Sequence, residues 1–300
     1  MIKIFTQSIM PPFVNIISFI FLLYISNKLT SSDLAYFFIN INIFLVSGAI
    51  IQFGFSVSGI KLLEKFKERG SAYMSEVISL CMTARLILFI FSFIAYLLLT
   101  HFYSAYNFYI FLSWLIYITS IFFDFEFIFL FLKKLYLPYL FKFLFIITSL
   151  FTVSIFQIDK FNDFILIWSL VYFVTNITLM FYLKIFYGLF FVSPSRIDFI
   201  SEFRESFIYF LLSFVAMLCY KVPFFYIANG SENKVINFYS LFEKINESIK
   251  VFIQYLTRFE YHSLLNFKNE RILKKNKFII KCSLSIFLIL QLIGLITYNF

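Results

Sequence analysis

The sequence has few of the residues that interrupt helices: seven glycines and five prolines occur among its 300 residues. Proline breaks a helix interior and glycine weakens it, so we expect long helices that are mostly unbroken. Charged residues are also scarce, at 14% of the chain, against about 25% in ordinary soluble domains. So few charges argue against a soluble globular protein.

Other absences narrow the function classes. The three cysteines, Cys81, Cys219 and Cys282, lie in or beside apolar runs at no metal-ligand spacing, which argues against a disulfide framework or a metal site. No G-x-x-x-x-G-K-[ST] motif occurs, which argues against ATP-driven transport within this chain. We therefore expect no cofactor and no metal. The first apolar run, from Ile9, is long enough to remain as a span, and no small-residue cleavage site follows it.

The sequence is instead rich in hydrophobic residues, which make up 62% of the chain and occur in recurring long runs. A helix needs about 20 apolar residues to cross a bilayer. The runs predict an all-α polytopic membrane protein with about nine transmembrane helices. The predicted spans are residues 9–27, 34–57, 76–100, 108–132, 137–157, 163–186, 205–228, 235–257 and 278–298.

These spans group into a first six-helix bundle and part of a second. The predicted division is an N-terminal transmembrane lobe over residues 1–188, a cytoplasmic linker over 189–204, and a partial C-terminal lobe of three helices over 205–300. Every predicted outer loop is short, which leaves no room for an outer catalytic domain.

The basic residues predict the orientation, because cytoplasmic loops of membrane proteins carry an excess of Lys and Arg. With the N-terminus in the cytoplasm, the inner connections hold most of the positive charge. They contain Lys3, Lys61, Lys65, Lys67, Arg69, Lys133, Lys134, Lys184, Arg196 and Arg204. The outer connections hold only Lys28, Lys160 and Lys234. The pattern indicates a multi-pass membrane protein with its N-terminus in the cytoplasm, and it assigns the net charge of +9 to loops rather than to nucleic-acid binding.

The same rule decides whether the charged segment 235–257 crosses the membrane. The region that follows it, 258–281, is the most basic of the chain and falls in the cytoplasm only if 235–257 is a span. At 100° per residue, Glu243, Glu247 and Lys250 then share one helix face. Charges in lipid are costly, so this face either lines a water-filled cavity of the substrate pathway or neutralises itself in buried pairs.

Two stretches six predicted helices apart are similar. One starts at Tyr24 as "YISNKLTSSDLAYFF" and the other starts at Tyr226 as "YIANGSENKVINFYS". Both open with Tyr-Ile-small-Asn and reach an aromatic pair twelve residues later. Parallel halves of this kind suit a transporter that works by alternating access to a site between them.

Four segments carry a resemblance to a known family. They are "ISNKLTSSDLAYFFI" from Ile25, "QFGFSVSGIKLLEK" from Gln52, "FFDFEFIFLFLKK" from Phe122 and "CYKVPFFYIAN" from Cys219 with the following "INFYSLFEKI". In order and spacing they resemble the bacterial polysaccharide flippases, the O-antigen (Wzx-like) branch of the MOP/MATE-like superfamily. The match departs where Pro223 stands near an Asp of many members, and where the Gln-Gly of the fourth helix is missing.

The resemblance implies a flippase that turns an undecaprenyl-diphosphate-linked oligosaccharide across the inner membrane for surface polysaccharide or lipopolysaccharide synthesis. It implies no enzyme activity, because no bond is made or broken. The implied partners are the lipid-linked oligosaccharide, membrane lipids, a polysaccharide polymerase and a chain-length regulator. Because family members have twelve or more spans, the resemblance also implies that the C-terminal half is incomplete. The alternatives are a membrane glycosyltransferase or O-antigen polymerase, a cation-coupled small-molecule exporter, and an inactive truncated remnant.

A carrier of a diphosphate lipid needs cations inside the membrane, which makes Arg85 and Lys221 candidates for the substrate cavity beside Glu243, Glu247 and Lys250. Arg85 has the alternative of a structural pair with an acid of the fourth span, and Lys221 could instead extend outward to the membrane surface. The acids of the fourth span, Asp124 and Glu126, have two interpretations: coupling to a proton or cation, and ion pairing with neighbouring cations. For Lys142, near the cytoplasmic start of the fifth span, extension toward the membrane surface is favoured.

Overall fold

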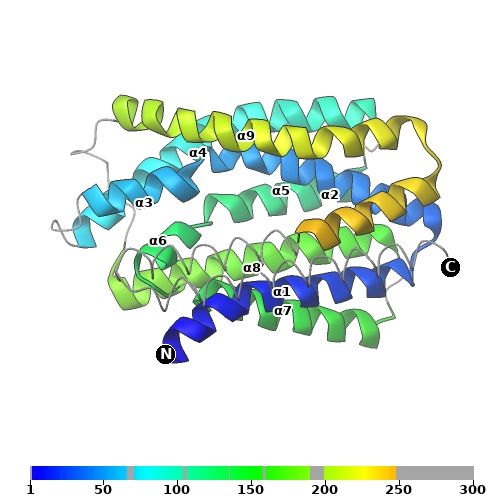
Figure 1. Cartoon of the computed structure of the whole chain (residues 1–300), viewed down its shortest axis with the longest axis horizontal. Helices are drawn as coiled ribbons and strands as arrows, with labels where there is room; N and C mark the ends of the chain where they lie inside the picture. Colours follow the sequence, from blue (N-terminus) through cyan, green and yellow to red (C-terminus); the bar gives the residue numbers. More distant parts are fainter. Residues whose placement is uncertain are drawn as a thin grey trace, which may run out of the picture.

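The computed structural model describes residues 2–65, 71–103, 107–134, 136–157, 160–189 and 199–247. Within these residues the chain is a bundle of helices that run roughly antiparallel (Figure 1). The helices are α1 (Ile2–Ser26), α2 (Ser31–Gln52), α3 (Phe55–Lys65), α4 (Ser71–Phe102), α5 (Phe108–Phe122), α6 (Glu126–Phe131), α7 (Tyr136–Ile155), α8 (Phe161–Tyr187) and α9 (Phe199–Gly230). A further helix covers residues 233–247.

The predicted class, an all-α polytopic membrane protein, is confirmed. Six helical stretches among the described residues are long and apolar enough to cross a membrane, and Phe13–Ser26 is a shorter apolar helix. The predicted count of nine spans stays a prediction, because residues 248–300, which include the span predicted over 278–298, lie outside the described part of the chain. The predicted division into lobes stays a prediction too.

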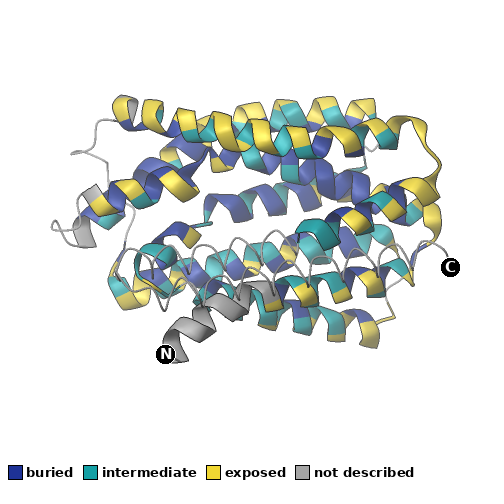
Figure 2. Ribbon diagram, in the orientation of Figure 1, coloured by how far each residue is buried: buried dark blue, intermediate teal, exposed yellow. Residues whose placement is uncertain are grey.

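The helix α2 is the centre of the bundle. In its apolar segment of 18 residues, 78% of the residues are buried inside the bundle, whereas the corresponding share for α9 is only 11%. Figure 2 shows the same contrast, with α2 buried over most of its length and α9 exposed over its outer face. The exposed side chains of α4 and α9 are largely apolar, as in Leu86, Ile90, Ile208 and Leu212. An apolar outer surface of this extent fits contact with lipid.

Polar side chains tie α2 to its neighbours in the core. The Trp114 indole N–H on α5 donates a hydrogen bond to Ser47 Oγ at 2.9 Å. Ser92 Oγ on α4 donates to the main-chain oxygen of Ser47 at 2.8 Å. Trp114 also stacks on Tyr96 with ring centroids 4.4 Å apart. Because water is absent from a bilayer interior, such internal hydrogen bonds fix how α2, α4 and α5 pack.

The expectation of mostly unbroken helices fails at two places. The span predicted over 34–57 is divided at Phe53 and Gly54, which both have positive φ angles, of 45° and 71°. The span predicted over 108–132 is divided between α5 and α6. Both breaks lie at the same end of the bundle, where α3 packs against α6. At this contact a Cβ on Gly59 would stand 2.7 Å from the Phe127 ring.

The first break is stabilised by contact with α9. An added Cβ at Gly54 would lie 2.8 Å from the Phe210 main-chain nitrogen and 2.9 Å from the carbonyl carbon of Tyr209. Backbone atoms cannot move aside as a flexible side chain can. Glycine is therefore required here both for its positive φ and for the close approach of two helices.

A Gly54→Ala substitution is expected to destabilise the bundle through this contact. The positive φ alone costs alanine about 1–2 kcal/mol, and overpacking adds about 1–3 kcal/mol. Gly188→Ala is the matched control, because Gly188 has a φ of 60° but nothing within 4 Å of an added Cβ. Thermal unfolding of the purified variants in detergent measures the difference. Equal losses for the two variants would contradict the packing argument.

Candidate functional site

Four charged side chains form an ion-pair cluster between α9 and the helix over residues 233–247. Lys221 Nζ lies 2.5 Å from Glu243 Oε1 and 3.4 Å from Glu247 Oε1. Lys244 Nζ lies 2.5 Å from Glu247 Oε2. The side chains of Lys221 and Glu243 are 4% and 3% exposed. Two lysines and two glutamates therefore balance each other's charge within the bundle.

The helical repeat explains how one short helix supplies three members of the cluster. Glu243 and Lys244 precede Glu247 by four and three residues, so each lies one turn from it. The fourth member, Lys221, comes from α9, and the neighbouring Tyr220 hydroxyl donates to the main-chain oxygen of Glu243 at 3.2 Å. Unpaired charges in a membrane interior cost at least ~2.5–3.5 kcal/mol each on insertion scales. If the segment predicted over 235–257 crosses the membrane, pairing of this kind offsets that cost.

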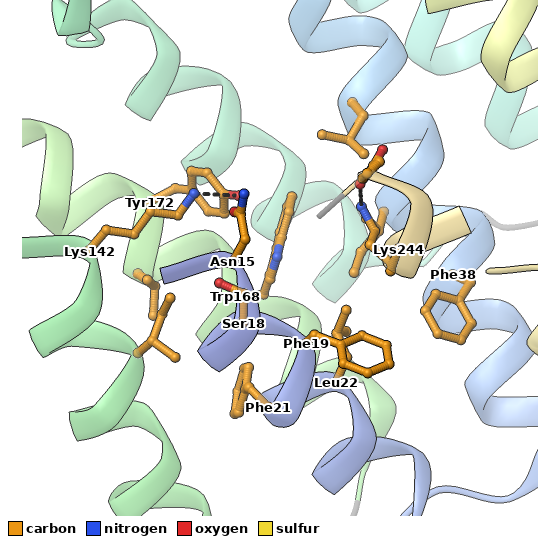
Figure 3. Close-up of a pocket in the computed structure, with 15 residues that line it drawn as sticks. Asn15, Ser18, Phe19, Phe21, Leu22, Phe38, Lys142, Trp168, Tyr172 and Lys244 are labelled. Carbon is orange, nitrogen blue, oxygen red and sulfur yellow. Dashed lines mark hydrogen bonds and ion pairs between the residues drawn. The ribbon is translucent and has the colours of Figure 1, made fainter. Parts of the chain in front are cut away.

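A cavity of about 380 Å³, here called the central cavity, adjoins the cluster. It lies among α1, α2, α7, α8 and the helix over residues 233–247, and its volume falls within the usual range of ligand pockets. Figure 3 shows Lys142 and Tyr172 on one side of it, next to Asn15, and Lys244 on the other side. The polar residues of its lining are Asn15, Ser18, Lys142, Tyr172, Lys244 and Glu247.

One wall of the central cavity is aromatic. Trp168 and Tyr172, both on α8, have ring centroids 4.8 Å apart. Tyr117 of α5 stacks on Trp168 at 5.0 Å, and Phe44 of α2 stacks on Tyr117 at 5.9 Å. Each ring packs against the next, and these contacts hold Trp168 and Tyr172 in fixed orientations at the cavity.

Lys142 belongs to the cavity. Sequence reasoning favoured its extension to the membrane surface, but the structure places it along the lining, half-buried. Its Nζ donates to the Tyr172 hydroxyl at 3.3 Å and lies 4.7 Å from the centroid of that ring. The central cavity thus has cations on two facing sides, Lys142 from α7 and Lys244 from the helix over residues 233–247.

A second cavity, of about 410 Å³, lies at the two helix breaks. The polar residues of its lining are Gln52, Ser56, Lys61, Arg85, Asp124 and Glu126. Across the nearby α3–α9 contact, Lys61 donates to the Tyr209 hydroxyl. Of the residues predicted from sequence, Arg85, Asp124 and Glu126 therefore meet at this second cavity.

Arg85 holds the end of α5. Its guanidinium donates through Nη1 to the main-chain oxygen of Phe122 and through Nη2 to that of Asp124, both at 2.8 Å. Its Cζ lies 5.3 Å from the centroid of Phe125, and the residue is only 2% exposed. The last carbonyls of a helix have no partner within the helix and carry partial negative charge. A planar cation with two parallel donors satisfies the last carbonyl of α5, that of Phe122, together with the Asp124 carbonyl just beyond the helix.

Both acids of the second cavity accept hydrogen bonds from uncharged groups. Asp124 Oδ2 accepts from Gln52 Nε2 at 3.4 Å, and its Oδ1 accepts from the main-chain nitrogen of Glu126 at 3.1 Å. Glu126 Oε1 accepts from the Tyr139 hydroxyl at 3.0 Å. The contact of Arg85 with Asp124 runs through the main chain rather than through the carboxylate.

The predicted candidates thus fall into two groups rather than one. Lys221, Glu243 and Glu247 meet in the cluster at the central cavity, and Arg85 lies at the second cavity with Asp124 and Glu126. Lys250 lies outside the described residues. Sequence reasoning did not select Lys244 or assign Lys142 to a site. Lys244 could have been found from its i,i+3 spacing to Glu247, whereas Lys142 faces partners on other helices and gives no local signal.

The contact between the two similar stretches lies away from both cavities. Asn237, at the start of the helix over residues 233–247, donates through Nδ2 to the main-chain oxygen of Ser31 at 2.8 Å. Ser31 begins α2, so the first turns of the two helices meet. At the opposite end of the bundle, Ser206 Oγ of α9 lies 2.9 Å from Ser58 Oγ of α3. The helices α2 and α3 therefore contact the C-terminal part of the described chain at both ends.

Comparison with known protein families, characterised proteins and solved structures finds no match to this chain. The membrane fold follows from the helices themselves, since six of those described have the length and composition of spans.

Proposed function

We propose that this chain carries an undecaprenyl-diphosphate-linked oligosaccharide across the bacterial inner membrane by alternating access, as a polysaccharide flippase. One observation carries the proposal: the central cavity places Lys142 and Lys244 on facing sides of a space of about 380 Å³ among helices of membrane-spanning type. Cations inside the membrane are costly and are kept where an anion or an ion pathway needs them.

Each part of such a ligand has a chemical counterpart in the lining. The diphosphate would lie between the two lysines, which donate to phosphate oxygens as point charges. The aromatic wall of Trp168 and Tyr172 suits packing against the apolar faces of sugar rings. Phe19 and Leu22 of α1 add apolar surface for the lipid side of the headgroup. The composition of the lining supports an amphipathic anion.

Alternating access would use the contacts at the two ends of the bundle. Asn237 with Ser31 closes one end, and Ser206 with Ser58 closes the other. At the end where Ser206 contacts Ser58, Phe53 also stacks on Phe203 with ring centroids 4.4 Å apart. Opening one set of contacts while the other holds would expose the central cavity to one side at a time. In the predicted orientation, the Asn237 end faces outward.

A cation-coupled exporter of small molecules is the second candidate class. Organic cations need an acidic cavity, whereas the charged side chains of the central cavity are Lys142, Lys244 and Glu247. Two positive charges against one negative charge favour an anionic ligand. The charge balance therefore supports the flippase over the exporter.

Lys142→Gln is expected to reduce transport at least ten-fold while leaving the fold intact, because Lys142 is half-buried and its hydrogen-bond partner Tyr172 is uncharged. The assay uses proteoliposomes with a fluorescent polyprenyl-diphosphate-linked oligosaccharide and a membrane-impermeant quencher. Lys184→Gln, at an exposed lysine near the end of α8, is the matched control. Wild-type transport by Lys142→Gln would overturn the role given to the cavity.

A further inference from the structure

The pair formed by Lys244 and Glu247 belongs to two features at once. Both residues line the central cavity, and both are members of the ion-pair cluster. The other pair of the cluster, Lys221 and Glu243, is nearly inaccessible, with the whole residues 3% and 4% exposed. Glu247 is 32% exposed at its side chain, so a ligand in the cavity can reach the Lys244–Glu247 pair.

The two lysines of the cavity differ in how far their charge is available. Lys142 has the neutral Tyr172 hydroxyl as its hydrogen-bond partner, at 3.3 Å. Lys244 lies 2.5 Å from Glu247 Oε2, so its charge is already compensated by a carboxylate of the same chain. A ligand with one anionic group can form an ion pair with Lys142. A ligand with two linked anionic groups can also reach Lys244, provided that it displaces Glu247.

Displacement would not leave Glu247 without a cation. Its other carboxylate oxygen, Oε1, already lies 3.4 Å from Lys221 Nζ. Glu247 can therefore release Lys244 and remain paired across to α9. A buried carboxylate with no such second partner would be held in place by the cost of leaving it uncompensated.

We infer that Glu247 is a specificity-determining residue, which competes with the ligand for Lys244 and makes the central cavity prefer a diphosphate to a monophosphate. The inference rests on the proposed function, since it takes the central cavity as an anion site. Glu247 acts on selectivity rather than on capacity to bind: an anion must carry enough charge on adjacent groups to replace the carboxylate. This would favour a diphosphate-linked lipid over phospholipids with a single phosphate.

The experiment measures binding of inorganic pyrophosphate and inorganic phosphate to the purified full chain in lipid nanodiscs, at constant ionic strength. The wild type is expected to bind pyrophosphate at least ten-fold more tightly than phosphate. Glu247→Gln keeps the size of the side chain and removes its charge. It is expected to tighten phosphate binding at least ten-fold and pyrophosphate binding less, so that the preference largely disappears.

Two further variants make the test specific. The double variant Lys244→Gln/Glu247→Gln is expected to bind phosphate no more tightly than the wild type, because the gain in Glu247→Gln comes from uncovering Lys244. Glu247→Asp keeps the charge but shortens the side chain, and it is expected to give an intermediate preference. It also tests the inference if Glu247→Gln does not fold.

The outcomes separate the inference from the proposed function. If the wild type binds both anions and the preference is unchanged in the folded Glu247 variants, the inference is overturned while the anion site stands. If no variant binds either anion, both fail. Phosphate binding that is measurable only after Glu247→Gln supports the inference directly.

Discussion

Replacing Arg85 with alanine is expected to give the largest loss of stability of any single substitution on α4. The guanidinium is 2% exposed and donates to the main-chain oxygens of Phe122 and Asp124. Hydrogen bonds to charged groups contribute about 1.5–3 kcal/mol each, so the loss is expected to be about 3 kcal/mol or more. Arg85→Lys should recover only part of it, because one ammonium cannot repeat the fork geometry.

Thermal unfolding in detergent tests this expectation, with Thr83→Ala on the same helix as the control. The Thr83 hydroxyl donates to the main-chain oxygen of Ser79 one turn earlier in the same helix. Reduced transport by an Arg85→Ala protein of wild-type stability would instead assign Arg85 to ligand binding at the second cavity. Unchanged stability and unchanged transport would remove Arg85 from both roles.

Replacing Lys221 with methionine is expected to destabilise the contact between α9 and the helix over residues 233–247 by about 3–5 kcal/mol, the usual cost of breaking a buried pair. The loss arises because Glu243, 4% exposed, is left buried without its partner at 2.5 Å. The double variant Lys221→Met/Glu243→Met is expected to regain most of the stability, because two apolar side chains of similar volume then fill the space.

The control for this cycle is Lys234→Met, since Lys234 is exposed at the start of the same helix. Unfolding of the single and double variants gives the coupling energy of the pair. A double variant that is as unstable as Lys221→Met would show that packing around Lys221, and not its charge, supports the contact.

The fold class could be predicted from the sequence because the physical requirement is local. A span needs a run of apolar residues, and each described helix of membrane-spanning length coincides with a predicted run. The alternation of basic and weakly charged loops is local in the same way. The three lysines of the predicted outer connections, Lys28, Lys160 and Lys234, all lie in connections or helix starts at one end of the bundle.

The breaks could not be predicted, because their causes are distant in sequence. Gly48 and Gly54 both lie within the span predicted over 34–57, yet the chain turns only at Gly54, where α9 packs closely. The break between α5 and α6 contains neither glycine nor proline. It depends on Arg85, which reaches its carbonyls across 37 and 39 residues of sequence.

The candidate site could be predicted in part. The spacing of Glu243 and Glu247 indicated a shared polar face, and the structure gives that face a partner in Lys221. Whether Lys221 points inward or extends to the membrane surface depends on which side of α9 packs against the next helix, and periodicity alone does not determine this. Lys142 faces Lys244 across the central cavity because of the way their helices pack in three dimensions, which neither local sequence shows.

The central position of α2 has a consequence for how the protein is made. The chain leaves the ribosome in order, so α2 enters the membrane before α4, α5, α8 and α9, the helices that finally cover it. Its buried amides must therefore pass an early stage surrounded by lipid. Asn40 donates to the oxygen of Tyr36 and Asn42 to that of Phe38, both at 2.9 Å within the helix. Because α2 brings these hydrogen bonds with it, it can be inserted first and serve as the axis on which later segments assemble during translation.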